Sequence, residues 1–194
     1  MDPVEGQLAA ESRWPMAGAV IAIIVSTVLL PDVVRPWPAW TLPALEVVLL
    51  VALAVVAPGR IDRRSREIRM LSIGLIAALA LGSFLSAGLL VAALIEGGAI
   101  TNEARALLQA GAQVWSSTWL SFALLYWELD CGGAAARAYG MPRSPDFAFP
   151  QQMNPDLAPP GWRPRFADYL YVSLTNSIAL SPTDAMPLPC GQSC

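Results

Sequence analysis

Long apolar stretches alternate with short polar connectors over the first two thirds of the chain. A helix crosses the hydrocarbon of a bilayer with about 20 apolar residues, within a range of about 17–25. Two of the stretches have that length, and the first two are shorter. The pattern predicts an all-α integral membrane bundle of four transmembrane helices, at about 16–30, 42–57, 71–95 and 106–129.

The first apolar stretch lies where a secretory signal peptide would be, but its flanks are those of a retained helix. The residues before it are acidic rather than basic, and no small-residue cleavage site follows it. A signal peptide needs a basic segment before the apolar stretch and a cleavage site after it. We therefore predict a membrane helix anchored at the interface by Trp14 and preceded by a disordered N-terminus, 1–13.

Arginine is concentrated between the second and third stretches. Five arginines lie within residues 59–70, and loops rich in Lys and Arg stay on the cytoplasmic side. This predicts a multi-pass protein of the cell inner (plasma) membrane, with residues 59–70 and the N-terminus cytoplasmic. The loop 96–105 is then extracytoplasmic.

Composition narrows the functions that this chain can perform. It is 55% hydrophobic and 14% charged, against about 25% charged residues in soluble domains. The net charge of −3 offers no basic surface for nucleic acid, and the chain has no histidine, the usual general base. Three cysteines are too few for a structural zinc site. We expect no enzyme activity, no cofactor and no metal.

Small side chains recur every fourth residue in the third stretch. Residues four apart lie on one face of a helix, and small residues there allow another helix to approach closely. The stripe predicts helix packing through Gly74, Ala78, Gly82 and Ser86.

Polar side chains follow the same spacing in the fourth stretch, at Gln109, Gln113, Ser117 and Ser121. Unpaired amides in hydrocarbon are costly, so this stripe is expected to face the bundle interior. There it would either hydrogen-bond between helices or line a polar path.

The second stretch carries a single charge, Glu46. Two interpretations remain open. Glu46 is either an intramembrane carboxylate that binds an ion or a proton, or a carboxylate one turn below the interface that reaches back to water.

Beyond the fourth stretch the chain becomes rich in proline and glycine. Residues 130–167 are predicted to form a cytoplasmic loop whose aromatic residues pack back on the bundle, because the prolines interrupt any helical period. Residues 168–188 are predicted to be a short amphipathic segment, in which Tyr169 to Leu180 can form a helix that lies at the interface or re-enters the membrane. The tail 189–194 follows.

The run 170–187 resembles, in a degenerate form, the pore segment of potassium channels. Leu170, Tyr171, Ser173, Asp184 and Pro187 fall on matching positions. The filter glycines are replaced by Ser181 and Thr183, so the carbonyl geometry of a selective filter is lost. The resemblance implies a channel-like or transport protein whose path would include Ser173, Thr175, Asn176, Ser181, Thr183 and Asp184.

Three phrases of the sequence resemble a family of uncharacterised actinobacterial integral membrane proteins. They are YWELD at 126–130, PDFAFPQQMNP at 145–155, and DYLYVSLTN with SPTDAMPL, which ends at Leu188. Members of that family continue into one more membrane helix. The resemblance implies that this chain lacks that helix through truncation, frameshift or loss.

The sequence therefore predicts a small membrane protein without a catalytic centre, which acts by packing or association. Its expected partners are membrane lipids, a second copy or another membrane protein. The alternative is a channel-like protein that uses 168–187 as a pore loop.

Overall fold

The computed structural model describes residues 14–36, 38, 40–56, 66–133, 145–154, 156, 159, 162–178 and 185–188. Helices make up most of this part of the chain, as predicted. The long helices are α1 (Trp14–Val28), α2 (Thr41–Val56), α3 (Arg66–Glu96) and α5 (Ala104–Leu129), and α8 (Phe166–Ile178) follows them. Shorter elements are α4 (Ala99–Asn102), the 3-10 helix η1 (Asp130–Gly132), α7 (Pro150–Met153), β1 (Phe147–Ala148) and β2 (Met186–Pro187).

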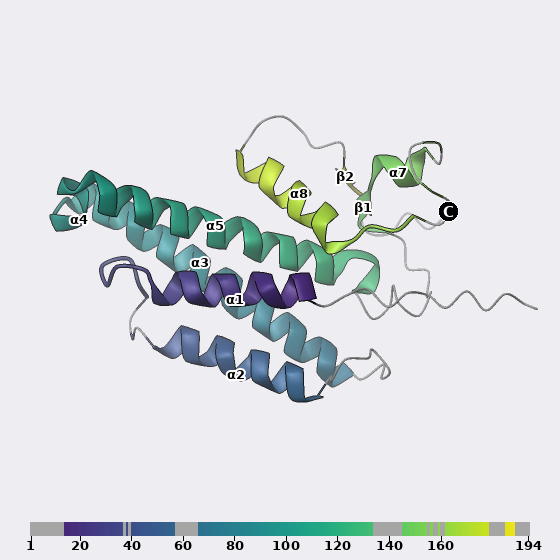
Figure 1. Cartoon of the computed structure of the whole chain (residues 1–194), viewed down its shortest axis with the longest axis horizontal. Coiled ribbons are helices and arrows are strands. Elements are labelled where there is room, and N and C mark those ends of the chain that lie inside the picture. Colours follow the sequence, from purple (N-terminus) through teal and green to yellow (C-terminus); the bar gives the residue numbers. More distant parts are fainter. Residues whose placement is uncertain are drawn as a thin grey trace, which may run out of the picture.

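The four long helices run alternately up and down (Figure 1). Short connectors force each helix to turn back beside the preceding one. The N-terminal end of α1, the C-terminal end of α2 and the start of α3 therefore lie at one end of the molecule, together with the C-terminal end of α5. The short helix α4 lies at the opposite end (Figure 1).

Helix α5 is the central element of the bundle. It packs against α1, α3 and α8, whereas α2 packs mainly on α3 and touches α1 less. The helix α8 crosses α5 on the side away from α2 (Figure 1). The order of helices in space therefore differs from their order in the sequence.

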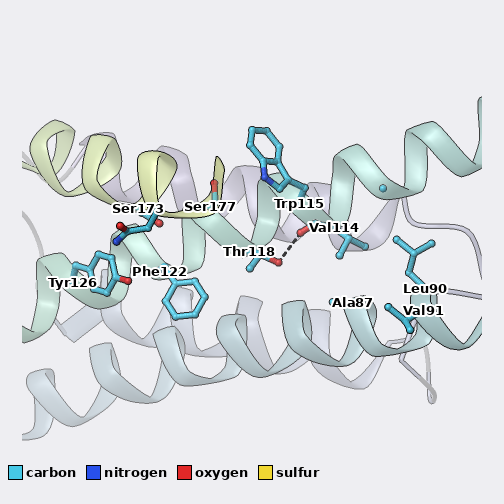
Figure 2. A pocket seen from close by; sticks show the side chains of 12 residues that line it. Ala87, Leu90, Val91, Val114, Trp115, Thr118, Phe122, Tyr126, Ser173 and Ser177 are labelled. Carbon is cyan, nitrogen blue, oxygen red and sulfur yellow. Dashed lines mark hydrogen bonds between the residues drawn. The ribbon is translucent and has the colours of Figure 1, made fainter. Parts of the chain in front are cut away.

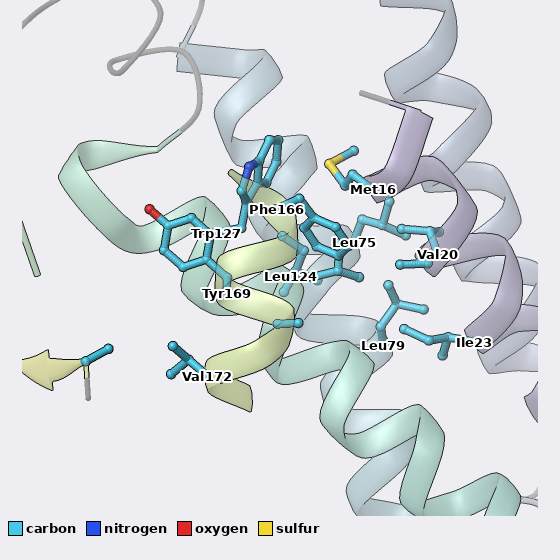
Figure 3. Close-up of a cluster of buried hydrophobic side chains, with 14 of the residues drawn as sticks. Met16, Val20, Ile23, Leu75, Leu79, Leu124, Trp127, Phe166, Tyr169 and Val172 are labelled. Carbon is cyan, nitrogen blue, oxygen red and sulfur yellow. The ribbon is translucent and has the colours of Figure 1, made fainter. Parts of the chain in front are cut away.

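The main core lies where α1, α3, α5 and α8 meet (Figure 3). Apolar residues at helical spacing on each of these helices point into it. Its largest fully buried apolar side chains include Val20 and Ile23 of α1, Leu75 and Leu79 of α3, Leu124 of α5 and Tyr169 of α8.

A smaller apolar cluster closes the opposite end of the bundle, and Val34 is fully buried in it. Arg35 stabilises the chain reversal there. Its guanidinium donates to the carbonyls of Val28 and Leu30, at the C-terminal end of α1, and pairs with Asp32 at 3.2 Å. A cation at this position also complements the helix dipole.

The aromatic residues of the C-terminal region pack back on the bundle, as predicted. Phe149 stacks edge-to-face on Tyr169, with ring centroids 5.5 Å apart, and Phe166 lies edge-on to Trp127 at 6.3 Å. The short antiparallel pair of β1 and β2 was not predicted, because two-residue strands leave no alternating pattern. Helix α8 begins at Phe166, ahead of the predicted start at Tyr169, and Asp168 accepts the N–H of Arg165 at 2.7 Å.

Among the described residues, one helix is both long and apolar enough to cross a membrane, over Arg69–Glu96. Pro15–Val28 and Thr41–Ala52 are apolar but shorter. Helix α5 has the length, with 26 residues, but its polar stripe lowers its hydropathy.

Candidate functional site

A groove of about 510 Å³ follows α5 between α3 and α8 (Figure 2). Its size falls within the range of about 300–1,000 Å³ that ligand pockets occupy. Most of the lining is aliphatic or aromatic. Helix α3 contributes Ala87, Leu90 and Val91, α5 contributes Gly111, Val114, Trp115, Thr118, Phe122 and Tyr126, and α8 contributes Ser173, Asn176 and Ser177.

The polar groups of the groove are concentrated on its α8 side. Three hydroxyls are already bonded to backbone carbonyls: Ser173 to Trp119 at 2.6 Å, Thr118 to Val114 at 2.8 Å, and Ser177 to Leu174 at 2.8 Å. The Asn176 side chain is exposed, and within the described part of the chain it has no hydrogen-bond partner. The groove therefore combines apolar walls with one free amide at its α8 side.

The polar stripe of α5 faces the bundle interior over part of its length. Ser117 and Ser121 are buried, and Ser121 Oγ lies 3.2 Å from Ser83 Oγ of α3. Gln113 is half-buried, and its Oε1 is buried without a partner among the described residues. Gln109 is exposed.

The structure does not join this stripe to the polar residues of α8. At 3.6 residues per turn, the stripe and the groove side of α5 are centred roughly 140° apart around the helix. Ser173 and Asn176 lie at the groove, and the Thr175 hydroxyl is bonded within α8. Ser181, Thr183 and Asp184 lie outside the described residues. The described polar residues therefore form two separate groups rather than one continuous path.

The small stripe of α3 meets α2 at Gly82. A Cβ atom built on Gly82 would lie 3.4 Å from Glu46 Oε1 and 3.7 Å from Leu42 Cδ1. Ala78 and Ser86 are buried, whereas Gly74 is half-buried with no atom within 4 Å of its Cβ position. Glu46 is 1% exposed, so its carboxyl group lies in the helix contact and does not reach water.

Asp130 is fully buried after α5, and sequence analysis did not identify its role. Its Oδ1 accepts the backbone N–H groups of Asp146 at 2.8 Å and Phe147 at 3.2 Å, and its Oδ2 accepts the hydroxyl of Tyr169. Leu188 N–H donates to the Asp146 carbonyl at 2.8 Å. The segments named above by their sequence phrases thus meet around one carboxylate.

The 3-10 turn that carries Asp130 requires a glycine at its end. Gly133 has φ +97°, and a Cβ atom there would lie 2.9 Å from the Glu128 carbonyl oxygen. Any other residue would be strained and would clash with backbone. Gly133 therefore fixes the direction in which the chain leaves α5.

Within the described ranges, no group of three or more His, Cys, Asp or Glu side chains lies close enough to hold a metal ion. Comparison with known proteins gave no match to any family model, curated protein or solved structure.

Proposed function

We propose that this chain is a multi-pass membrane protein without a catalytic centre, in which α1, α2, α3 and α5 cross the bilayer. We further propose that the groove between α3, α5 and α8 holds an acyl chain of a membrane lipid. The observation that carries the proposal is the apolar groove itself, which lies on a surface rich in exposed aliphatic side chains.

The first support is the exposed surface of the long helices. Large apolar side chains stay exposed along α1, α2 and α3, where water would disfavour so extended a patch. Only 39% of the most apolar part of α3 is buried within the protein, although a core helix of a soluble protein would be mostly covered. The exposed residues include Ile21, Val25, Val48, Val51, Leu81, Phe84, Val91 and Leu94.

Helix length is the second consideration. With 31 and 26 residues, α3 and α5 are about 46 and 39 Å long at 1.5 Å per residue. Both exceed the roughly 30 Å of bilayer hydrocarbon. Helices α1 and α2 are about 22 and 24 Å long by the same rise, and a thinner local bilayer or adjoining apolar residues can accommodate such spans.

A lipid chain fits the groove better than a polar ligand does. The walls are apolar, so a polar molecule would lose hydration without regaining hydrogen bonds. Asn176 supplies one free amide beside these walls, which suits a molecule with a long apolar tail and a polar head. In a bilayer, lipid is also the occupant present at the highest concentration.

The test compares lipid retention by groove variants in intact-protein mass spectrometry after detergent purification. Gly111→Leu fills the groove, and its Cβ position has no neighbour within 4 Å, so the fold should tolerate it. Leu108→Phe is the matched control, because Leu108 is exposed on the same helix outside the groove. We expect at least about a tenfold loss of retained lipid in Gly111→Leu, since excluding two methylenes at about 0.8 kcal/mol each gives that factor.

Three results would contradict the proposal. Equal lipid retention by the wild type and Gly111→Leu would show that the groove holds no lipid. A wild-type dimer that Gly111→Leu converts to a monomer would assign the groove to a second copy. Ion flux through protein-containing liposomes that depends on Asn176 would instead favour the channel-like alternative.

A further inference from the structure

Glu46 is a buried carboxyl group that has no partner in the part of the chain that the structure describes. Its side chain is 1% exposed, and neither Oε1 nor Oε2 has a hydrogen-bond partner among the described residues. The group points from α2 onto α3, where Gly82 leaves room for it. Buried polar groups are almost always paired, and an unpaired buried carboxylate is costly unless its charge is neutralised.

Glu46 also lies far from the charged ends of its neighbour. Gly82 is 13 residues from Arg69 and 14 from Glu96 along α3, which is about 20 Å in either direction at 1.5 Å per residue. Although Glu46 is close to the start of α2, its carboxyl group meets α3 near the middle of that helix.

No charged group faces Glu46 from the helices packed against α2. Within the described residues, α1 carries no titratable side chain, and α3 carries none between Arg69 and Glu96. The charged residues nearest to Glu46 along the described chain are Asp32 and Arg35. They form an ion pair with each other, and Arg35 also donates to a carbonyl at the end of α1. A bare carboxylate in this contact would therefore have no compensating charge among the described residues.

A metal cation is a poor match for this place. Hard cations need about six oxygen ligands, and the hydroxyl nearest along α3, that of Ser83, donates to the Leu79 carbonyl and lies beside Ser121. A proton needs no further ligand, and it removes the charge that burial penalises most. Neutralisation by a proton is thus the chemistry that fits the surroundings.

We propose that Glu46 is a proton-binding site, held as the neutral carboxylic acid in the contact between α2 and α3. Loss of the proton leaves a carboxylate that this contact does not accommodate, so ionisation requires the contact between α2 and α3 to open. Because α2 packs mainly on α3 and touches α1 less, it can move without disturbing α5 and α8. The site is independent of the lipid groove, and each proposal can fail while the other stands.

Infrared spectroscopy of the purified protein in detergent tests the protonation state directly. The isosteric variant Glu46→Gln should remove intensity from the carbonyl band of protonated carboxylic acids at neutral pH. The control Glu96→Gln, an exposed acid at the end of α3, should remove intensity from the carboxylate band instead. Loss of carboxylate intensity in Glu46→Gln would overturn the proposal.

Thermal unfolding against pH gives a second, independent readout. We expect the wild-type melting temperature to fall as the pH rises, because alkali ionises Glu46 in any state where α2 has separated from α3. Glu46→Gln should flatten that fall, and Glu96→Gln should not. A rise in melting temperature on adding Na⁺, seen in the wild type and lost in Glu46→Gln, would assign the site to a cation and overturn the proton.

Discussion

Asp130 is a single side chain that ties together segments far apart in the sequence. It accepts two backbone N–H groups from 146 and 147 and the hydroxyl of Tyr169, which are 16, 17 and 39 residues away. Hydrogen bonds to a charged acceptor contribute about 1.5–3 kcal/mol each, and a buried donor left unpaired costs about 1–3 kcal/mol. One carboxylate therefore holds the C-terminal region on the end of α5.

Replacing Asp130 by asparagine should destabilise the protein by more than replacing Tyr169 by phenylalanine. Asp130→Asn turns one acceptor oxygen into a donor that faces other donors, whereas Tyr169→Phe removes one hydroxyl. We expect Tyr169→Phe to cost about 1–3 kcal/mol and Asp130→Asn to cost more. The measurement is the thermal unfolding midpoint in detergent, followed by tryptophan fluorescence. An Asp130→Asn midpoint equal to that of the wild type would contradict this role.

At the scale of elements, the contact between α3 and α5 includes one pair of buried hydroxyl side chains. Ser83 and Ser121 are both buried, with their hydroxyl oxygens 3.2 Å apart. Bonds of this kind between membrane helices contribute about 0.6 kcal/mol on average. Close approach of the two helices therefore contributes more than the hydrogen bond does.

Size should accordingly matter more than polarity at Ser121. Ser121→Ala should cost about 0.6 kcal/mol, whereas Ser121→Leu should cost about 1–3 kcal/mol through overpacking. Resistance to denaturation in a mixed detergent titration measures both. Gln109→Leu, at an exposed position of α5, is the control and should change little. A larger loss in Ser121→Ala than in Ser121→Leu would show that the hydrogen bond dominates.

The sequence allowed the helices to be predicted better than their contacts. Apolar runs and prolines placed α1, α2, α3 and α5 within a few residues of their observed ends. The role of Asp130 was not predictable, because its partners depend on how 145–148 and α8 fold back. The contact of Glu46 with Gly82 was not predictable either, since spacing shows which face of a helix a residue occupies but not which helix covers that face.

At the scale of the whole molecule, the exposed aliphatic side chains of α1, α2 and α3 decide which solvent the protein needs. Leu81 is 54% exposed near the middle of the apolar segment Arg69–Glu96. In water such a surface would drive association. In lipid it has no cost, because hydrocarbon chains surround it.

A charge at Leu81 should therefore impair membrane insertion. Leu81→Arg adds about 2.5–3.5 kcal/mol to the insertion of α3, the value for arginine at a helix centre. The fraction of protein that stays in the membrane pellet after alkaline carbonate washing should fall. Leu81→Ala and Asn102→Arg, the latter beyond the end of α3, should both behave like the wild type. Undiminished membrane retention of Leu81→Arg would argue against a spanning α3.

The central position of α5 has a consequence for biosynthesis. Helix α1 packs on α5 far more than on α2. The hydroxyl of Ser26 donates to the carbonyl of Gln113, which lies 87 residues later in the sequence. A ribosome adds about 5–20 residues per second, so this stretch takes roughly 4–17 s to synthesise. The nascent chain must hold α1, α2 and α3 in an unfinished arrangement for that time, and assembly of the core begins only when α5 arrives.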